Sequence, residues 1–297
     1  MELIPSLRVA VWSACDLSCE YCHREGDVHP GRHLADRELL MLLRAALPLG
    51  LRKIKLTGGE PLLRPGLPAL VRELAALGAD LSLTTNGLEL ATQAGDLAAA
   101  GLRRVNISLD TLRPERFREL TGEDRLAGVL EGVRAAAKAG LALELDAVVL
   151  RGVNEEETVD LIAFAGGLGA RIQFIELSQV GISSTYYRRR HRDLESLERW
   201  LRERGEALED ATRRFDRPRF RVNGVTVSLC RFVRYAEPGA RRRGLRLAAD
   251  GRVYGFRYGE PPRADLGAAL RGGAGQARLT ELWARCVRIG QEVSAAR

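Results

Sequence analysis

The chain has 297 residues, of which 45% are hydrophobic and 29% are charged, a balance typical of globular proteins. No stretch approaches the roughly 18 uninterrupted apolar residues of a membrane span, so no membrane-spanning helix is expected. The net charge is +7, but lysine occurs only at Lys53, Lys55 and Lys138. Arginine is therefore the ordinary basic residue of this chain, and the total charge is weak evidence of a nucleic-acid partner.

Alternating apolar segments take turns with segments of helical periodicity over the first 180 residues. Strands are predicted at 7–12, 52–57, 80–85, 103–109, 142–149 and 171–177. Helices are predicted near 36–47, 66–77, 91–100, 125–139 and 155–168. Gly50, Gly78, Gly101, Gly140 and Gly169 each stand just before a strand, where a helix commonly ends. Repeated β–α units predict a parallel sheet with right-handed crossovers, and six of them predict an α/β partial (β/α)6 TIM-like barrel rather than a closed ring of eight.

One face of these strands is polar throughout. It carries Arg8, Lys53, Lys55, Ser82, Thr84, Arg104, Asn106, Ser108, Glu144 and Asp146. A parallel sheet rarely leaves a face in water. The polar face is therefore either solvated or, as we favour, the lumen of a sheet that curls because its helices lie on one side.

The regular alternation of predicted strands and helices ends after residue 178. A basic loop is predicted at 186–192, a helix at 193–205, hairpins that turn at Asn223-Gly224 and Asp250-Gly251, an irregular segment at 264–275 and a closing helix at 279–293. We therefore predict two parts, a barrel over residues 1–180 and a C-terminal extension with β-hairpins over 181–297 that caps the substrate.

Cys15, Cys19 and Cys22 form a CxxxCxxC pattern just after the first predicted strand. A structural zinc site needs four ligands, and a CxxC redox pair would leave Cys15 unexplained. Three thiolates fit a [4Fe–4S] cluster with one iron open to another ligand. The first residues lack a basic region followed by an apolar core, so no export signal is expected, and the cysteines suggest a reducing cytoplasm.

These cysteines are followed by an ordered series of further motifs. The series is LTGGEPLLR (56–64), LTTNG (83–87), NISLD (106–110), VVLRGVN (148–154) and FIEL (174–177). Together with the cysteines it resembles the radical S-adenosylmethionine (SAM) superfamily, and within it most closely the branch of the GTP cyclase of molybdenum-cofactor biosynthesis. The resemblance covers residues 7–180.

The resemblance implies one [4Fe–4S] cluster held by Cys15, Cys19 and Cys22, whose open iron binds SAM. Reduction of the cluster then cleaves SAM to a 5′-deoxyadenosyl radical that abstracts hydrogen. The positions matching the SAM-contacting motifs are Tyr21, Gly58, Gly59, Glu60, Thr84, Asn86 and Ser108, although each also has an ordinary structural reading in a loop, turn or strand. An electron donor such as flavodoxin or ferredoxin is implied as a partner.

The basic residues of the polar face suggest an anionic substrate. Arg8, Lys53, Lys55 and Arg151 are the candidate substrate-binding cations, joined by Asp146. Buried cations need anionic partners. Glu144 and Asp146 could neutralise them within the protein, but the cations outnumber these carboxylates, which favours a small anionic metabolite.

The sequence departs from the cyclase where that enzyme carries a second, C-terminal cluster. Cys230 matches the first ligand position, but the second falls near Val233 and the third near Phe256, and Gln173 stands where a cyclase arginine is expected. One thiolate cannot hold a cluster. Cyclisation of GTP is therefore not expected. The end of the barrel where the cyclase holds its second cluster is expected to be lined instead by Tyr254, Phe256 and the arginine-rich segment 241–246.

The sequence thus predicts a cytoplasmic, single-cluster radical SAM enzyme acting on a nucleotide, nucleoside or sugar phosphate or carboxylate. The outcome could be cyclisation, epimerisation, decarboxylation or a related rearrangement. Cys230 is a candidate hydrogen donor to a substrate radical, and the role of Cys286 stays open. The alternatives are a peptide-modifying radical SAM enzyme and a non-catalytic Fe–S or RNA-binding protein. The arginine-rich segments 188–192 and 241–243 would support RNA binding.

Overall fold

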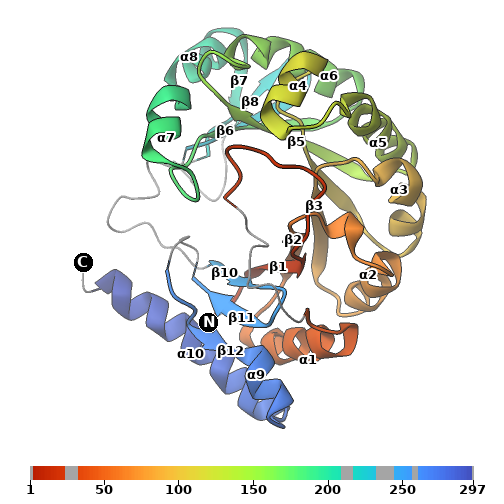
Figure 1. Cartoon of the computed structure of the whole chain (residues 1–297), viewed down its shortest axis with the longest axis vertical. Coiled ribbons are helices and arrows are strands. Elements are labelled where there is room, and N and C mark those ends of the chain that lie inside the picture. Colours follow the sequence, from red (N-terminus) through yellow and green to blue (C-terminus); the bar gives the residue numbers. More distant parts are fainter. Residues whose placement is uncertain (1–2, 24–32, 209–216, 232–243, 256–259, 296–297) are drawn as a thin grey trace.

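The computed structural model describes residues 3–23, 33–208, 217–231, 244–255 and 260–295. Six parallel strands follow one another in chain order through the middle of a single sheet. They are β1 (Ser6–Trp12), β2 (Lys53–Gly58), β3 (Asp80–Thr85), β4 (Arg104–Ser108), β5 (Ala142–Val149) and β6 (Arg171–Glu176). The sheet curls into an open barrel with the helices outside it (Figure 1). The predicted α/β partial barrel is confirmed, and each strand lies within one residue of its predicted bounds.

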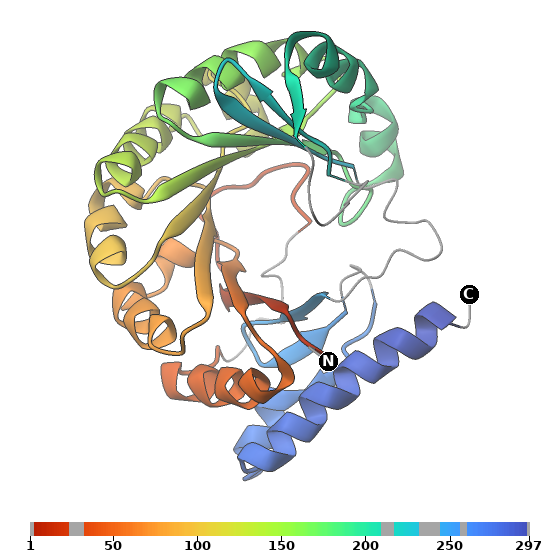
Figure 2. The same ribbon diagram turned by 180° about the vertical axis from the view of Figure 1, so that it is seen from behind.

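The outer layer has one helix or helical pair after each of the strands β1 to β5 (Figure 2). Its members are α1 (Asp36–Ala46), α2 (Leu67–Ala75), α3 (Leu90–Ala99), α4 (Pro114–Thr121), α5 (Leu126–Lys138) and α6 (Thr158–Gly167), with short 3-10 turns η1 (Leu47–Leu49), η2 (Pro61–Leu63) and η3 (Glu155–Glu157). The apolar strand face packs under this layer, where Val9, Leu56 and Ile107 are fully buried. The polar face is thereby left to the lumen.

The C-terminal hairpins continue the barrel sheet at both of its edges. Strand β9 (Val225–Cys230) pairs in parallel with β6 and carries β8 (Arg219–Val222) and β7 (Glu206–Leu208) beyond it. Strand β10 (Gly244–Leu247) pairs in parallel with β1 and carries β11 (Arg252–Tyr254) and β12 (Ala264–Asp265). Both predicted turns connect these hairpins. The sheet therefore runs across residue 180, and the division into two parts stays a prediction.

Three local predictions are wrong. The expected basic loop at 186–192 is mostly helix α7 (Ser184–Arg190), which begins where the Ser183 side chain accepts a hydrogen bond from the Tyr186 amide. The expected irregular segment at 264–275 contains β12 and helix α9 (Leu266–Arg271), capped by the Asp265 side chain. Helix α4 was not expected, because its eight residues carry too short an apolar pattern.

The closing part of the chain packs on the outside of the barrel. Helix α8 (Glu195–Arg204) matches its prediction, and α10 (Gln276–Ala295) lies against α1. Trp283, fully buried, donates its indole N–H to the Leu42 carbonyl at 2.9 Å. Within the described part of the chain, no helix is long and apolar enough to cross a bilayer.

Candidate functional site

The cysteine loop, residues 13–23, leaves the C-terminal end of β1 and arcs toward α4 and α7 (Figure 1, red). Its start is tied to the turn after β2, since Glu60 N–H donates to the Ala14 carbonyl at 2.7 Å. Its middle is tied to α4, since Ser18 N–H donates to the Thr121 carbonyl at 3.0 Å. The loop therefore runs between the carboxyl ends of the strands, where barrel sites form.

The three cysteines of this loop differ in exposure. Cys15 and Cys22 are exposed, whereas Cys19 is half-buried. Burial raises the pKa of Cys19 to about 12, and nearby Asp110 and the other two thiols raise it further. A thiolate at Cys19 thus needs positive charge beside it, which the irons of a cluster supply.

The donor set fits an iron–sulfur cluster better than a closed metal site. Three thiols come from one eight-residue span. In the described residues, no group of three or more His, Cys, Asp or Glu side chains is arranged around a common metal position. The spacing of three cysteines on one loop matches a [4Fe–4S] cluster that leaves one iron to another ligand.

Gly58 and Gly59 are required by the close approach of the end of β1 and of the cysteine loop. Gly58 has a φ of 154°, and a Cβ there would lie 2.2 Å from the Trp12 carbonyl oxygen. A Cβ on Gly59 would lie 2.3 Å from the Ala14 carbonyl oxygen. Gly58 thus admits the backbone at the end of β1 and Gly59 admits the backbone of the cysteine loop, a role that the sequence did not indicate. Their predicted contact with SAM stays a prediction.

The variant Gly59→Ala should displace the cysteine loop and lower the free energy of unfolding by about 2–4 kcal/mol, because the clashing atoms are backbone oxygens. Urea unfolding measures the effect. The matched control is Gly95→Ala, in α3, where a Cβ meets no atom within 4 Å. Since alanine favours a helix interior over glycine, this control should be neutral or stabilising. Equal effects of the two variants on the free energy of unfolding would contradict the conclusion that Gly59 must lack a side chain.

Glu60 joins the turn after β2 to the end of β3. Its carboxylate, 1% exposed, accepts hydrogen bonds from Thr85 Oγ1 at 2.6 Å, Asn86 N at 2.7 Å and Leu62 N at 2.9 Å. Burial raises its pKa to about 7 despite these donors. Glu60 is therefore a structural brace beside the cysteine loop, and its predicted contact with SAM remains open.

The other predicted SAM-contacting residues lie along β3 and β4. Asn86 is engaged with the loop, because its Nδ2 donates to Asp16 Oδ1 at 2.7 Å. Thr84 Oγ1 is buried and has no hydrogen-bond partner in the described residues. Ser108, half-buried, ends β4 beside Asp146. Thr84 and Ser108 are thus the residues of this group that remain available to a ligand.

Tyr21 lies in the apolar cluster of Leu120, Leu150, Val153 and Leu177, and its hydroxyl donates to Asp110. Burial raises the pKa of Tyr21 well above its ordinary value, and the Asp110 charge adds to this. Tyr21 therefore attaches the cysteine loop to the end of β4. The sequence did not single out Asp110, although it stands in the NISLD motif.

Cations of three neighbouring strands lie in one row on the lumen face. Arg246 of β10 is in register with Arg8 of β1, and Arg8 is in register with Lys55 of β2. Arg246 also stacks on the Tyr254 ring, 5.5 Å from its centroid. Arg246 belongs to the arginine-rich segment 241–246 that was predicted to line the barrel, and it extends the pair of Arg8 and Lys55. Lys53 is exposed at the start of β2, and Arg151 is exposed in the loop after β5.

The opposite side of the lumen is acidic and amide-rich. Asp146 accepts hydrogen bonds from Asn106 Nδ2 at 3.1 Å and Gln173 Nε2 at 3.0 Å. Glu144 also accepts from Asn106, and burial together with nearby Asp146 raises its pKa. Lys55 lowers the pKa of Glu144, so the two charges interact. The acidic side of the lumen therefore lies within electrostatic reach of the cation row at Lys55.

The remaining cysteines lie apart from the cysteine loop. Cys230 ends β9, is 2% exposed and shares the lumen face of Ser228. Cys286 is fully buried in α10, on the outer side of the barrel. Val233, Phe256 and arginines 241–243 lie outside the described residues.

Comparison with known proteins agrees with this geometry. The family model of the radical SAM superfamily matches residues 9–165. A probable GTP 3′,8-cyclase of Pyrococcus abyssi is 36% identical over 96% of this chain and 94% of its own length. The GTP 3′,8-cyclase of Gloeobacter violaceus is 38% identical over 95% of this chain and 90% of its own length.

Two solved structures share the fold. Streptococcus suis SuiB bound to S-adenosylmethionine superposes with a TM-score of 0.67 at 16% identity, over 89% of this chain and 64% of that one. The enzyme anSMEcpe with bound AdoMet superposes with a TM-score of 0.59 at 18% identity, over 88% and 78%. At these identities the likeness concerns the fold alone.

Proposed function

Because the chain belongs to the radical SAM superfamily and is a radical SAM enzyme, we propose that it uses a single cluster to act on a small anionic metabolite. The substrate class is a nucleotide, nucleoside or sugar that carries a phosphate or carboxylate. The observation that carries this proposal is the cation row of Arg246, Arg8 and Lys55 on the lumen face. Guanidinium and ammonium groups side by side on a lumen face can offer charge-assisted hydrogen bonds to a phosphate or carboxylate.

Cys15, Cys19 and Cys22 would hold the cluster, and an external one-electron donor such as flavodoxin or ferredoxin would reduce it. When bound, the cluster and SAM supply a 5′-deoxyadenosyl radical for hydrogen abstraction. The protein's own contribution is to bind and orient. Thr84 and Ser108 offer hydroxyl groups on the lumen face for SAM, and the cation row would orient the anionic end of the substrate.

A single cluster is supported by the number and placement of the cysteines. After Cys22 the chain contains only Cys230 and Cys286. Cys230 ends β9 on the lumen face, and Cys286 is buried in α10 on the outer side of the barrel. Two such cysteines cannot supply a second three-thiolate site. We therefore propose a reaction other than GTP cyclisation, even though the relatives reported above are named GTP 3′,8-cyclases.

The proposal is tested by incubating the reduced, cluster-loaded enzyme with SAM and deuterated metabolites. The panel comprises nucleotides, nucleoside carboxylates and sugar phosphates, with GTP and neutral nucleosides as separate arms. Transfer of deuterium into 5′-deoxyadenosine from an anionic compound would support the proposal. Transfer from GTP with formation of a cyclised product would overturn the exclusion of the cyclase reaction. Transfer only from neutral compounds would overturn the anionic substrate class.

Arg8→Ala should raise KM for the substrate found in that panel by about tenfold, with a smaller change in kcat, because a charged contact to the bound anion is lost. Steady-state kinetics checks this result. The control is Arg278→Ala, which removes an exposed arginine of α10 that pairs with Glu281. An unchanged KM in Arg8→Ala would remove Arg8 from the proposed binding row.

A further inference from the structure

A tyrosine hydroxyl connects the cysteine loop to the wall of the barrel. It belongs to Tyr21, which lies between Cys19 and Cys22 and donates to the Asp110 carboxylate. Asp110 is 7% exposed and follows β4 by two residues. The contact therefore connects the segment that carries two cluster cysteines with the strand that ends at Ser108.

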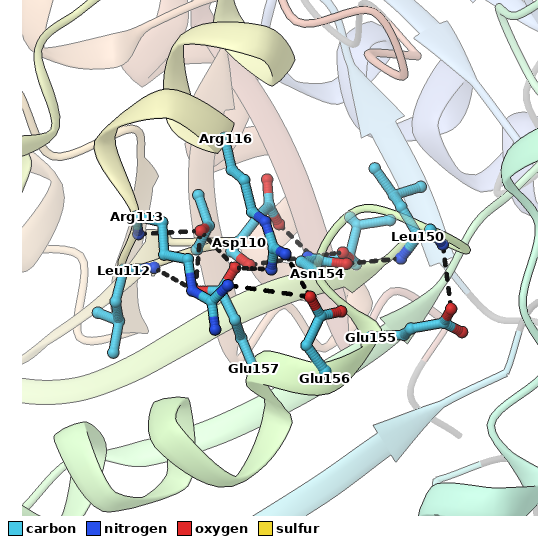
Figure 3. A network of polar contacts seen from close by, with 12 residues as sticks. Asp110, Leu112, Arg113, Arg116, Leu150, Asn154, Glu155, Glu156 and Glu157 are labelled. Atoms are coloured by element: carbon cyan, nitrogen blue, oxygen red, sulfur yellow. Dashed lines mark hydrogen bonds and ion pairs between the residues drawn. The ribbon is translucent and has the colours of Figure 1, made fainter.

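The Asp110 carboxylate is itself fixed from the other side. Its Oδ1 accepts a hydrogen bond from Val148 N at 2.7 Å, which holds it against β5. Its backbone carbonyl accepts from Asn154 Nδ2 at 2.7 Å, and Asn154 also donates to the Val148 carbonyl at 2.8 Å (Figure 3). With Asn154 2% exposed, these bonds lie away from water, where each is stronger and more directional. Asp110 therefore has little freedom to move.

A second layer of contacts supports the same region. Glu157, 1% exposed, accepts hydrogen bonds from Thr111 Oγ1 at 2.7 Å, Leu112 N at 2.9 Å and Arg116 Nη1 at 2.7 Å (Figure 3). Arg116 belongs to α4, the helix whose last carbonyls accept from the backbone of the cysteine loop. The cysteine loop thus contacts this hydrogen-bond network at two points. Its backbone bonds to the end of α4, and the Tyr21 hydroxyl bonds to Asp110.

We propose that Asp110 is a positioning residue that sets the place of the cysteine loop through Tyr21. By fixing Tyr21 it holds Cys19 and Cys22 at a constant distance from the end of β4, where Ser108 is predicted to contact SAM. Loss of this contact leaves the cysteines in the chain but lets the loop shift relative to the SAM-binding residues. The inference rests on the proposed cluster at Cys15, Cys19 and Cys22.

The test compares Tyr21→Phe, Asp110→Asn and the double variant as cluster-loaded proteins. The readouts are iron content, the Kd for SAM, and the change that SAM causes in the electron paramagnetic resonance spectrum of the reduced cluster. Each single variant should retain iron, bind SAM about tenfold more weakly and show an altered spectral change, because one charge-assisted hydrogen bond is lost. The double variant should be no weaker than the singles, because both remove the same contact.

The matched control is Tyr186→Phe, which removes a buried hydroxyl that has no hydrogen-bond partner within the described residues and packs beside the same apolar cluster. It should bind SAM like the wild type. If Asp110→Asn does not fold, Tyr21→Phe still tests the inference, because it leaves the bond from Val148 to Asp110 intact. Single variants with full iron content, wild-type Kd and wild-type spectra would overturn the inference alone. A wild-type protein that binds neither iron nor SAM would overturn the proposed function, and the inference with it.

Discussion

Cys19→Ala should lose the cluster and with it all reductive cleavage of SAM. The cysteine loop offers three free thiols, those of Cys15, Cys19 and Cys22, within one span of eight residues. Two thiolates do not hold a four-iron cluster. Cys19 is the least exposed of the three, so its side chain lies deepest in the site. Iron analysis and measurement of 5′-deoxyadenosine after anaerobic reconstitution check the result.

Cys286→Ala is the matched control for this variant. Cys286 is buried in α10 against α1, and burial raises its pKa to about 11, so it stays a neutral thiol. The control should keep its iron and its cleavage of SAM, with a modest loss of stability from the small cavity. Full iron content in Cys19→Ala would contradict the ligand assignment.

Glu60→Ala should lower the free energy of unfolding by about 3–5 kcal/mol. The substitution leaves three hydrogen-bond donors without their acceptor in a site that is 1% exposed, and each buried unsatisfied donor costs about 1–3 kcal/mol. Urea denaturation of the metal-free protein measures the loss. Glu73→Ala, an exposed position of α2, should change stability by less than about 0.5 kcal/mol. A small effect at both positions would contradict the role of Glu60 as a brace.

The same carboxyl should make stability depend on pH. Burial raises the pKa of Glu60 from 4.5 to about 7. Between these values the unfolded state has released the proton while the folded state keeps it, so stability falls as pH rises through this window. The pKa of Asp110, raised to about 6 by burial, acts in the same direction over the lower part of the window. Urea unfolding from pH 4.5 to 7 should show this slope, and Glu60→Gln should flatten it. An unchanged slope of stability against pH in Glu60→Gln would contradict the conclusion that Glu60 causes it.

Local pattern sufficed to predict the barrel. The six strands alternate apolar and polar residues, and glycines such as Gly50 and Gly140, with φ of 90° and 76°, mark where helices end. The sequence did not indicate where the hairpins pair, because β9 and β10 join strands that are distant in the chain, and such pairing leaves no local pattern. Helix α7 was missed because its run of arginines has no apolar periodicity.

In the candidate site too, residues with a local sequence pattern could be predicted, whereas residues that depend on distant partners could not. The cysteines, Gly58 and Gly59 could be singled out from the sequence because their spacing is local, and their roles toward a cluster and SAM stay predictions. Asp110 and Asp16 were missed, because their partners Tyr21 and Asn86 lie 89 and 70 residues away. The reason for Gly59 was also non-local, since the atoms it must admit belong to Ser13 and Ala14 of another segment.

The central claim is one cluster on the cysteine loop of a radical SAM enzyme. Anaerobic reconstitution with iron and sulfide, followed by iron counting and addition of reductant and SAM, tests it most directly. We expect about four irons per chain, as one [4Fe–4S] cluster requires, and formation of 5′-deoxyadenosine. About eight irons per chain would contradict the single cluster, and bound zinc without iron would contradict the whole account.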